Sequence, residues 1–368
     1  SEGTLAAITE ATLRLVPNDP QQVEIRFFGE DGADLDDDGK RKVERYFNRQ
    51  DFRRVLPREI GDIDFPPRAL EGYAVALEAC VDVRAVRAAG FKVVIDYGYG
   101  TTAFVMPNLL SKLGTEVLAV NPYVATAGIL DFDRFQHAEQ VAGLVRTSGA
   151  TLGAVVDPGG EQLTLIDDTG RVLDDTTTLL ALLALHGDEL DGREVALPVA
   201  VTQQADALVE RQGGRVRPTK LGGAAVMAAA REPEVVFAAG LNGGFVVPEF
   251  VPAYDASATL VRTLELLAKR EVRLSEVVAD LPELHLVQES VVTPWEQKGA
   301  VMRTLMERSG DRELVLVDGV KVLHDGGWVL ALPDPDEPVT NVWAEAGSDQ
   351  AARQLVDEYV RRIRQMIR

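Results

Sequence analysis

The chain has 368 residues and a single cysteine, Cys80, so no disulfide can form within it. No apolar run approaches the roughly 20 residues that a membrane-spanning helix needs. The first segment, SEGTLAAITEATLRLVP, carries neither a basic leader nor a small-residue cleavage site. These absences argue against a disulfide-stapled or membrane-embedded protein, and we expect a cytoplasmic one.

Positive charge is scarce in this sequence. The chain carries 38 Lys and Arg residues against 58 Asp and Glu residues, which gives a net charge of −20. Such a surface repels the phosphates of nucleic acids and provides no general field to attract an anionic substrate. We therefore expect no nucleic-acid partner, and any phosphate site has to be a local one.

Common catalytic motifs are missing as well. The sequence holds no GxSxG turn, no Walker loop and no HExxH pair. We interpret Cys80 as a small apolar residue on a helix. The histidines stand apart in the sequence, so none can share a helix face with another as a metal ligand. They are His137, His186, His285 and His324.

The sequence does contain a repeated alternation of apolar strands and amphipathic helices. In KVVIDYGYGTTAFVMPNLLSKLGTEVLAV, a strand at 92–96 leads through a glycine turn into a helix and then into a strand at 116–120. The block REVALPVAVTQQADALVERQGGRVRPT repeats this order. Such alternation predicts α/β units built around mainly parallel sheets.

The C-terminal part has a different pattern. RELVLVDGVKVLHDGGWVLALPDP and VTNVWAEA alternate polar and apolar residues, which is typical of an antiparallel sheet, and a long helix is expected at 348–368. Linkers are expected at HGDELDGR and VVTPWEQKG. We therefore predict an α/β protein whose last domain is α+β, divided into segments 1–88, 89–190, 191–299 and 300–368.

The acidic run DLDDDGKRKVER has the first positions of an EF-hand calcium loop. Asp34, Asp36, Asp38 and Gly39 fall at the expected spacing, but the twelfth position, where such a loop needs a glutamate, is Arg45. We interpret the run as a solvated turn that begins the helix GKRKVERYFNRQ.

The turn DYGYGTTA meets the GxGxxG/A spacing with Gly98, Gly100 and Ala103, between a strand and a helix. A dinucleotide site also requires an acid at the end of the next strand, where this sequence has Asn121. We favour a structural tight turn, and keep a dinucleotide-binding oxidoreductase as a remote alternative.

Several segments, taken in chain order, resemble one family. PNDPQQVEIRFFGEDG, KVVIDYGYG, TLGAVVDPGGEQLTLIDDTGRVL, EVVFAAGLNGGFV and GWVLALPDPDEPVTNVWAEA are similar to successive segments of the α-D-phosphohexomutases. These enzymes move a phosphate between the 1- and 6-hydroxyls of glucose or mannose. The resemblance implies three α/β mutase-type domains, the first truncated, and a C-terminal α+β domain with an antiparallel sheet, arranged around a central cleft.

The resemblance also shows where this chain departs from the family. The catalytic serine, which carries a phosphate in the family, aligns with Pro17, and its neighbours Asn18 and Asp19 cannot carry that ester. The magnesium loop, DGDGDR in the family, is DPGGEQ here. It leaves Asp157 and Glu161 as weak metal ligands. These residues therefore identify no cofactor, and we expect magnesium binding to be weak at most.

The sugar loop and the phosphate loop depart from the family in the same direction. GExSGH becomes Gly240, Leu241, Asn242, Gly243 and Gly244, of which only the asparagine side chain can hydrogen-bond to a sugar. RPSGTEP becomes LPDPDEP, which replaces the phosphate-binding arginine by a leucine and adds acids. The acids at the phosphate-loop position are Asp334, Asp336 and Glu337.

These departures favour a phosphohexomutase-like protein without mutase activity, a binding, regulatory or assembly module of sugar-nucleotide metabolism. PNDPQQVEIRFF resembles in particular the C-terminal region of bacterial mannose-1-phosphate guanylyltransferase fusion proteins, although no nucleotide loop is present. A phosphosugar ligand, a nucleotidyltransferase partner and a homo-oligomer are the partners to consider. The alternative hypothesis is an active phosphomannomutase or phosphoglucomutase.

Overall fold

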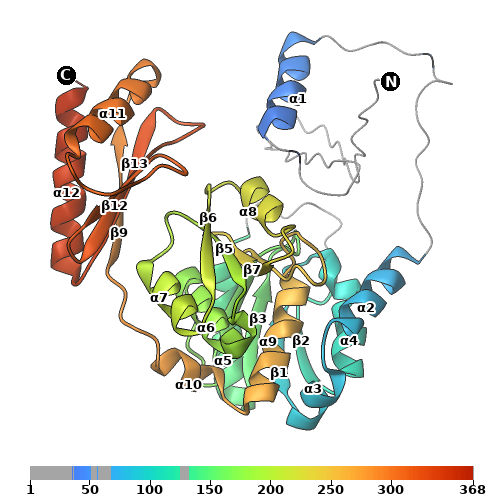
Figure 1. Ribbon diagram of the computed structural model, residues 1–368. Coiled ribbons are helices and arrows are strands. Elements are labelled where there is room, and N and C mark those ends of the chain that lie inside the picture. Colours follow the sequence, from blue (N-terminus) through green and yellow to red (C-terminus); the bar gives the residue numbers. More distant parts are fainter. Residues whose placement is uncertain (1–34, 36, 51–55, 57–67, 125–131, 368) are drawn as a thin grey trace.

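The computed structural model describes residues 35, 37–50, 56, 68–124 and 132–367 (Figure 1). The predicted positions Pro17, Asn18 and Asp19 lie outside these residues. The helix expected after the acidic run is present as α1 (Asp37–Arg49). No helix in the described part of the chain is both long and apolar enough to cross a bilayer.

The first sheet has the strand order β2-β1-β3-β4. Its first three strands are parallel and β4 runs antiparallel to β3. The apolar strands β1 and β3 are buried on both faces, as expected for a sheet covered by helices. Its strands are β1 (Lys92–Asp96), β2 (Glu116–Val120), β3 (Leu152–Val156) and β4 (Leu163–Ile166). Its helices are α2 (Ala69–Ala79), α3 (Val83–Ala89), η2 (Thr101–Phe104), α4 (Met106–Lys112), α5 (Arg134–Ser148) and α6 (Asp175–His186).

The second sheet has the order β6-β5-β7-β8 and repeats this plan, with parallel strands and an antiparallel edge. Both sheets share one apolar core, in which α6 is buried along most of its length. Its strands are β5 (Glu194–Pro198), β6 (Arg215–Thr219), β7 (Val235–Ala239) and β8 (Phe245–Val246). The remaining elements are η3 (Gly187–Leu190), α7 (Gln203–Arg211), α8 (Gly223–Ala229), α9 (Ala256–Arg270) and α10 (Leu274–Ala279).

The third sheet is antiparallel, with the order β10-β11-β12-β13-β9, and it confirms the predicted α+β character of the C-terminal part. Helices α11 and α12 pack on one of its faces around a separate apolar core. Its strands are β9 (Leu286–Val292), β10 (Leu314–Val315), β11 (Val320–His324), β12 (Gly327–Pro333) and β13 (Val339–Ala346). Its helices are α11 (Trp295–Arg308) and α12 (Asp349–Met366).

The start of this C-terminal domain differs from our expectation. We placed its beginning at residue 300, but β9 pairs with β13 along its whole length, so the domain starts near residue 286. The reason is that β9 is an edge strand with mostly exposed or half-buried residues, which weakens the alternation of polar and apolar residues. The segment 280–285 joins this domain to the two α/β sheets (Figure 1).

Candidate functional site

The loop DPGGEQ follows β3, and its aspartate faces its own backbone. Oδ1 of Asp157 accepts hydrogen bonds from the backbone N–H of Glu161 and of Gln162, each at 2.7 Å. Oδ2 accepts from the N–H of Gly159 at 3.1 Å. Within the described ranges, no group of three His, Cys, Asp or Glu residues is placed to hold a metal ion. Both carboxylate oxygens of Asp157 are thus hydrogen-bonded within its own loop.

A second turn supports this loop. A Cβ atom at Gly98 would overlap with the carbonyl oxygen of Val156, and one at Gly100 would lie 2.7 Å from the carbonyl oxygen of Pro158. Gly98 also has a positive φ of 54°. The two backbones can therefore approach each other only because these residues are glycines. This contact accounts for the GxG spacing as a structural turn, without a bound dinucleotide.

Loop 240–244, where we expected the sugar loop, lies beside DPGGEQ. The N–H of Leu163 donates to the carbonyl oxygen of Gly243 at 2.9 Å, and Gln162 and Gly244 form an isolated β-bridge. Asn242, the residue that we expected to hydrogen-bond to a sugar, is exposed. Two loops that are about 80 residues apart in the sequence thus form one surface.

The glycines of this loop are packed against an aromatic ring. A Cβ atom at Gly240 would lie 2.7 Å from the hydroxyl oxygen of Tyr254, and one at Gly244 would lie 3.0 Å from its ring. A Cβ atom at Gly223 would also lie 3.0 Å from this ring. The ring of Tyr254 therefore occupies the space into which side chains at 240 and 244 would otherwise project. Sequence reasoning missed this residue, because its spacing from the three glycines follows no motif.

A half-buried cation lies next to the same loop. The side chain of Arg134 is 11% exposed, and its guanidinium pairs with the Asp175 carboxylate at 2.5 Å and donates to the hydroxyl of Thr164 at 3.2 Å. Burial raises the pKa of Asp175, although the adjacent guanidinium opposes the shift. A side chain at Gly243 would collide with this arginine. Sequence reasoning missed Arg134, whose charge is matched by Asp175 within the protein.

Beneath these loops lies a polar network at the ends of β1 and β2. The buried carboxylate of Asp96 accepts from the backbone N–H of Gly98, from the amide of Asn121 and from Nδ1 of His137 at 2.8 Å. Tyr99 and Asn121 adopt positive φ angles of 56° and 48°. The network holds the turn that supports DPGGEQ. It gives Asn121 and His137 structural partners that their isolated positions in the sequence did not suggest.

The segment where we expected the phosphate loop connects β12 and β13. Oδ1 of Asp334 accepts from the backbone N–H of Asp336 at 2.9 Å and of Glu337 at 3.0 Å, and Oδ2 accepts from the amide of Asn341 at 3.1 Å. These hydrogen bonds lower the pKa of Asp334. The ammonium of Lys298 donates to the carbonyl oxygens of residues 334 and 337. The backbone of this loop is thus hydrogen-bonded to its own carboxylate and to a cation from α11.

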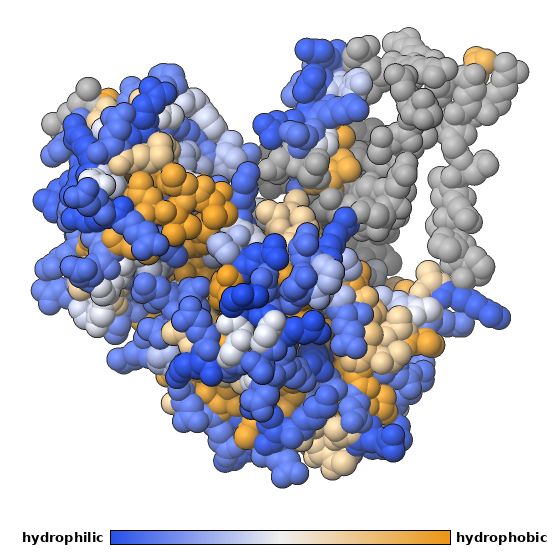
Figure 2. Space-filling model, viewed as in Figure 1, coloured by the Kyte–Doolittle hydropathy of each residue, from blue (hydrophilic) through white to orange (hydrophobic). Residues whose placement is uncertain are grey.

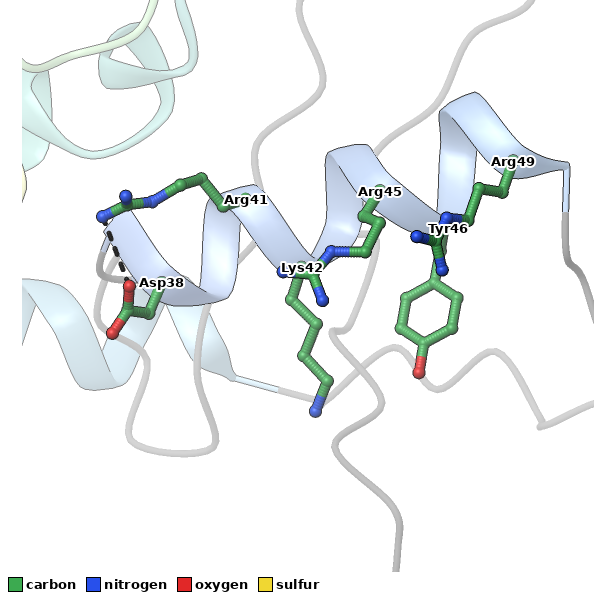
Figure 3. A pocket seen from close by; sticks show the side chains of 6 residues that line it. All are labelled: Asp38, Arg41, Lys42, Arg45, Tyr46 and Arg49. Atoms are coloured by element: carbon green, nitrogen blue, oxygen red, sulfur yellow. Dashed lines mark ion pairs between the residues drawn. The ribbon is translucent and has the colours of Figure 1, made fainter.

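Basic side chains gather along α1. A pocket of about 370 Å³ lies along this helix, and basic side chains form most of its lining (Figure 3). Asp38, an acid of the calcium-loop pattern, forms an exposed ion pair with Arg41 at 3.2 Å. The lining residues are Asp38, Arg41, Lys42, Arg45, Tyr46 and Arg49.

Two family models match the chain. The model of phosphoglucomutase/phosphomannomutase alpha/beta/alpha domain II matches residues 71–170, and that of domain III matches residues 174–285. A probable phosphoglucosamine mutase of Methanopyrus kandleri is 29% identical over 95% of this chain and 77% of its own length. A phosphoglucomutase/phosphomannomutase of Thermococcus kodakarensis is 28% identical over 92% of this chain and 75% of its own length.

Solved structures share the fold. A phosphoglucomutase/phosphomannomutase family protein of Burkholderia thailandensis superposes with a TM-score of 0.76 at 20% identity, covering 92% of this chain and 72% of that one. N-acetylphosphoglucosamine mutase of Aspergillus fumigatus, in complex with GlcNAc-6P and magnesium, has a TM-score of 0.56 at 14% identity. That match covers 83% of this chain and 68% of the fungal one.

Proposed function

Because the chain belongs to the α-D-phosphohexomutase superfamily, we propose that it is a phosphohexomutase-like protein of hexose-phosphate and sugar-nucleotide metabolism that lacks mutase turnover. It acts as a binding, regulatory or assembly module. The observation that carries the proposal is the Asp334 carboxylate, which occupies the backbone N–H groups of its own loop.

A phosphate at this loop would have to displace that carboxylate. Backbone N–H groups bind anions when they point into an open concavity, whereas here two of them are already hydrogen-bonded to Asp334. Asp336 and Glu337 add like charges, each costing on the order of 1 kcal/mol near a phosphate at a hydrated surface. The ammonium of Lys298 donates to two loop carbonyls and lies over the ring of Trp295, which leaves at most one of its three N–H groups for an anion.

The metal loop supports the same proposal. Magnesium prefers an octahedral set of oxygen ligands, often including one or two carboxylates. Both oxygens of Asp157 accept hydrogen bonds from the loop, and Gly159 replaces the middle acid of the family's DGDGDR. Oδ1 accepts two hydrogen bonds and Oδ2 accepts one, so Asp157 can offer a magnesium ion one oxygen at most without losing a loop hydrogen bond, and we expect a weak site.

A sugar phosphate remains the ligand class to test. The A. fumigatus protein with this fold was solved with GlcNAc-6P, and in our chain the exposed Asn242 lies on the loop beside DPGGEQ. We propose that a nucleotidyltransferase is the macromolecular partner of this module, following the resemblance of PNDPQQVEIRFF to guanylyltransferase fusion proteins. The second candidate function is an active phosphomannomutase or phosphoglucomutase, which the names of the relatives favour.

The deciding experiment is a turnover assay with magnesium, a bisphosphate activator and glucose-1-phosphate or mannose-1-phosphate. We expect no 6-phosphate product. Turnover that Asp157→Ala abolishes, while the exposed-site control Asp188→Ala retains it, would favour the active mutase instead. Calorimetry should give millimolar or weaker phosphosugar affinity, about −4 kcal/mol or less favourable.

A further inference from the structure

The C-terminal domain touches the second sheet through the face that α11 and α12 do not cover. Figure 1 shows this domain beside the α/β sheets, and Figure 2 shows apolar residues on its side facing them. Apolar side chains from both bodies form one buried cluster there. The buried members of the cluster are Val199, Ala200, Trp328, Leu330 and Trp343.

A buried glutamate crosses this interface. Glu345, on β13, is 4% exposed. Its Oε1 accepts from the hydroxyl of Thr202 at 2.5 Å, and its Oε2 accepts from the backbone N–H of Gln203 at 2.7 Å. The indole N–H of Trp328 also donates to Oε2 at 2.7 Å. One carboxylate from the C-terminal domain thus has three donors, two of them in the other body.

The position of these donors at the start of α7 explains why this site favours a negatively charged side chain. Thr202 is the N-cap of α7 and Gln203 is its first helical residue. The first N–H groups of a helix have no partner within the helix, and the helix dipole places positive potential there. Glu345 therefore supplies from another domain the negative charge that the start of α7 favours.

A buried lysine crosses the interface in the same region. Lys321, on β11, is 9% exposed, and its ammonium donates to the carbonyl oxygen of Val199 at 2.8 Å. The ammonium also lies over the ring of Trp328, 4.0 Å from the ring centroid. The indole of Trp328 therefore touches both buried charges, through its N–H and through its face.

We propose that Glu345 and Lys321 form a latch that holds the C-terminal domain against the β5–α7 segment. Releasing the latch frees this domain to swing about the segment 280–285 and moves the β12–β13 turn relative to loop 240–244. The inference concerns domain closure alone, and it stands whether or not the protein binds a phosphosugar.

Backbone hydrogen exchange and small-angle X-ray scattering of the unliganded full chain test the latch. Glu345→Ala should raise amide exchange in a peptide covering the start of α7 by at least tenfold and shift the scattering toward larger radii. Glu345→Gln keeps the shape and one acceptor oxygen, so a smaller increase is expected. The matched control is Glu289→Ala, an exposed acid of the same sheet, which should leave both readouts unchanged.

Lys321→Met is the second variant, because it keeps the apolar stem and removes the ammonium. It should give a threefold or larger increase in exchange at the same peptide. Unchanged protection of α12 and β12 within the C-terminal core shows that each variant is folded. If both folded variants scatter like the parent chain, apolar packing alone holds the domains together and the latch is refuted, even where exchange at the start of α7 rises through loss of the Glu345 acceptor.

Discussion

The two acidic loops of this protein use the same local chemistry in different surroundings. In each, a half-buried aspartate accepts hydrogen bonds from backbone N–H groups two or more residues further along the chain. The Asp157 loop is supported by the glycine turn at 98–100 and by loop 240–244, whereas the Asp334 loop is a hairpin tip supported by Lys298 and Asn341. The comparison shows that one turn motif can be part of a domain core or almost self-contained.

The largest expected effect concerns the support of the Asp157 loop. Gly98→Ala should lower the free energy of unfolding by about 3 kcal/mol, because the new Cβ overlaps with the carbonyl of Val156 and the residue keeps a positive φ. The control, Gly149→Ala, has a similar φ but open space around its Cβ, and should cost only about 1 kcal/mol. Urea denaturation compares the two, and equal losses would contradict the argument from backbone contact.

The second effect concerns ligand affinity at the Asp334 loop. Asp334→Ser with Asp336→Thr should tighten phosphosugar binding, because it removes two like charges and frees loop N–H groups. Adding Leu332→Arg should contribute roughly 1.5 to 3 kcal/mol more through a charge-assisted contact. Calorimetry measures both steps. Leu316→Arg, at an exposed leucine outside this loop, adds the same charge and should leave affinity unchanged.

Removing each aspartate compares the two loops directly. Asp157→Ala should cost about 1 to 2 kcal/mol of unfolding free energy, because it leaves three N–H groups of a half-buried loop without their acceptor. Asp334→Ala should cost about 0.5 to 1 kcal/mol, because water can reach the exposed residues 336 and 337. A larger loss from Asp334→Ala would reverse our view of which loop is integrated into the core.

The smallest effect is the pH dependence of the Asp334 loop. The pKa of Asp334 is lowered in the folded chain, so its stabilising contribution is present above the ordinary aspartate pKa and is lost as pH falls through the lowered value. The stability difference between the parent chain and Asp334→Asn should therefore shrink on acidification from neutral pH to below pH ~3. Denaturation at several pH values checks this, and a difference that grows in acid would contradict it.

The apolar alternation predicted both α/β units and the C-terminal antiparallel sheet, because strand and helix periodicities are local properties of the chain. The expected boundary at 299 does not coincide with the start of the third sheet, because β9 is an edge strand whose partner, β13, lies about 50 residues away. Its membership in the sheet depends on that pairing more than on its own weak pattern.

For the candidate site, the resemblance to the family predicts from the sequence alone which groups are missing: a serine at 17, the middle acid in DPGGEQ and the arginine in LPDPDEP. Only the tertiary structure decided where the remaining groups point. The fold directs the carboxylates of Asp157 and Asp334 toward the backbone of their own loops. It also places Tyr254 and Arg134 beside loop 240–244, and Glu345 at the start of α7. The physical reason is that donors and van der Waals neighbours come from segments far apart in the chain, so no local spacing records them.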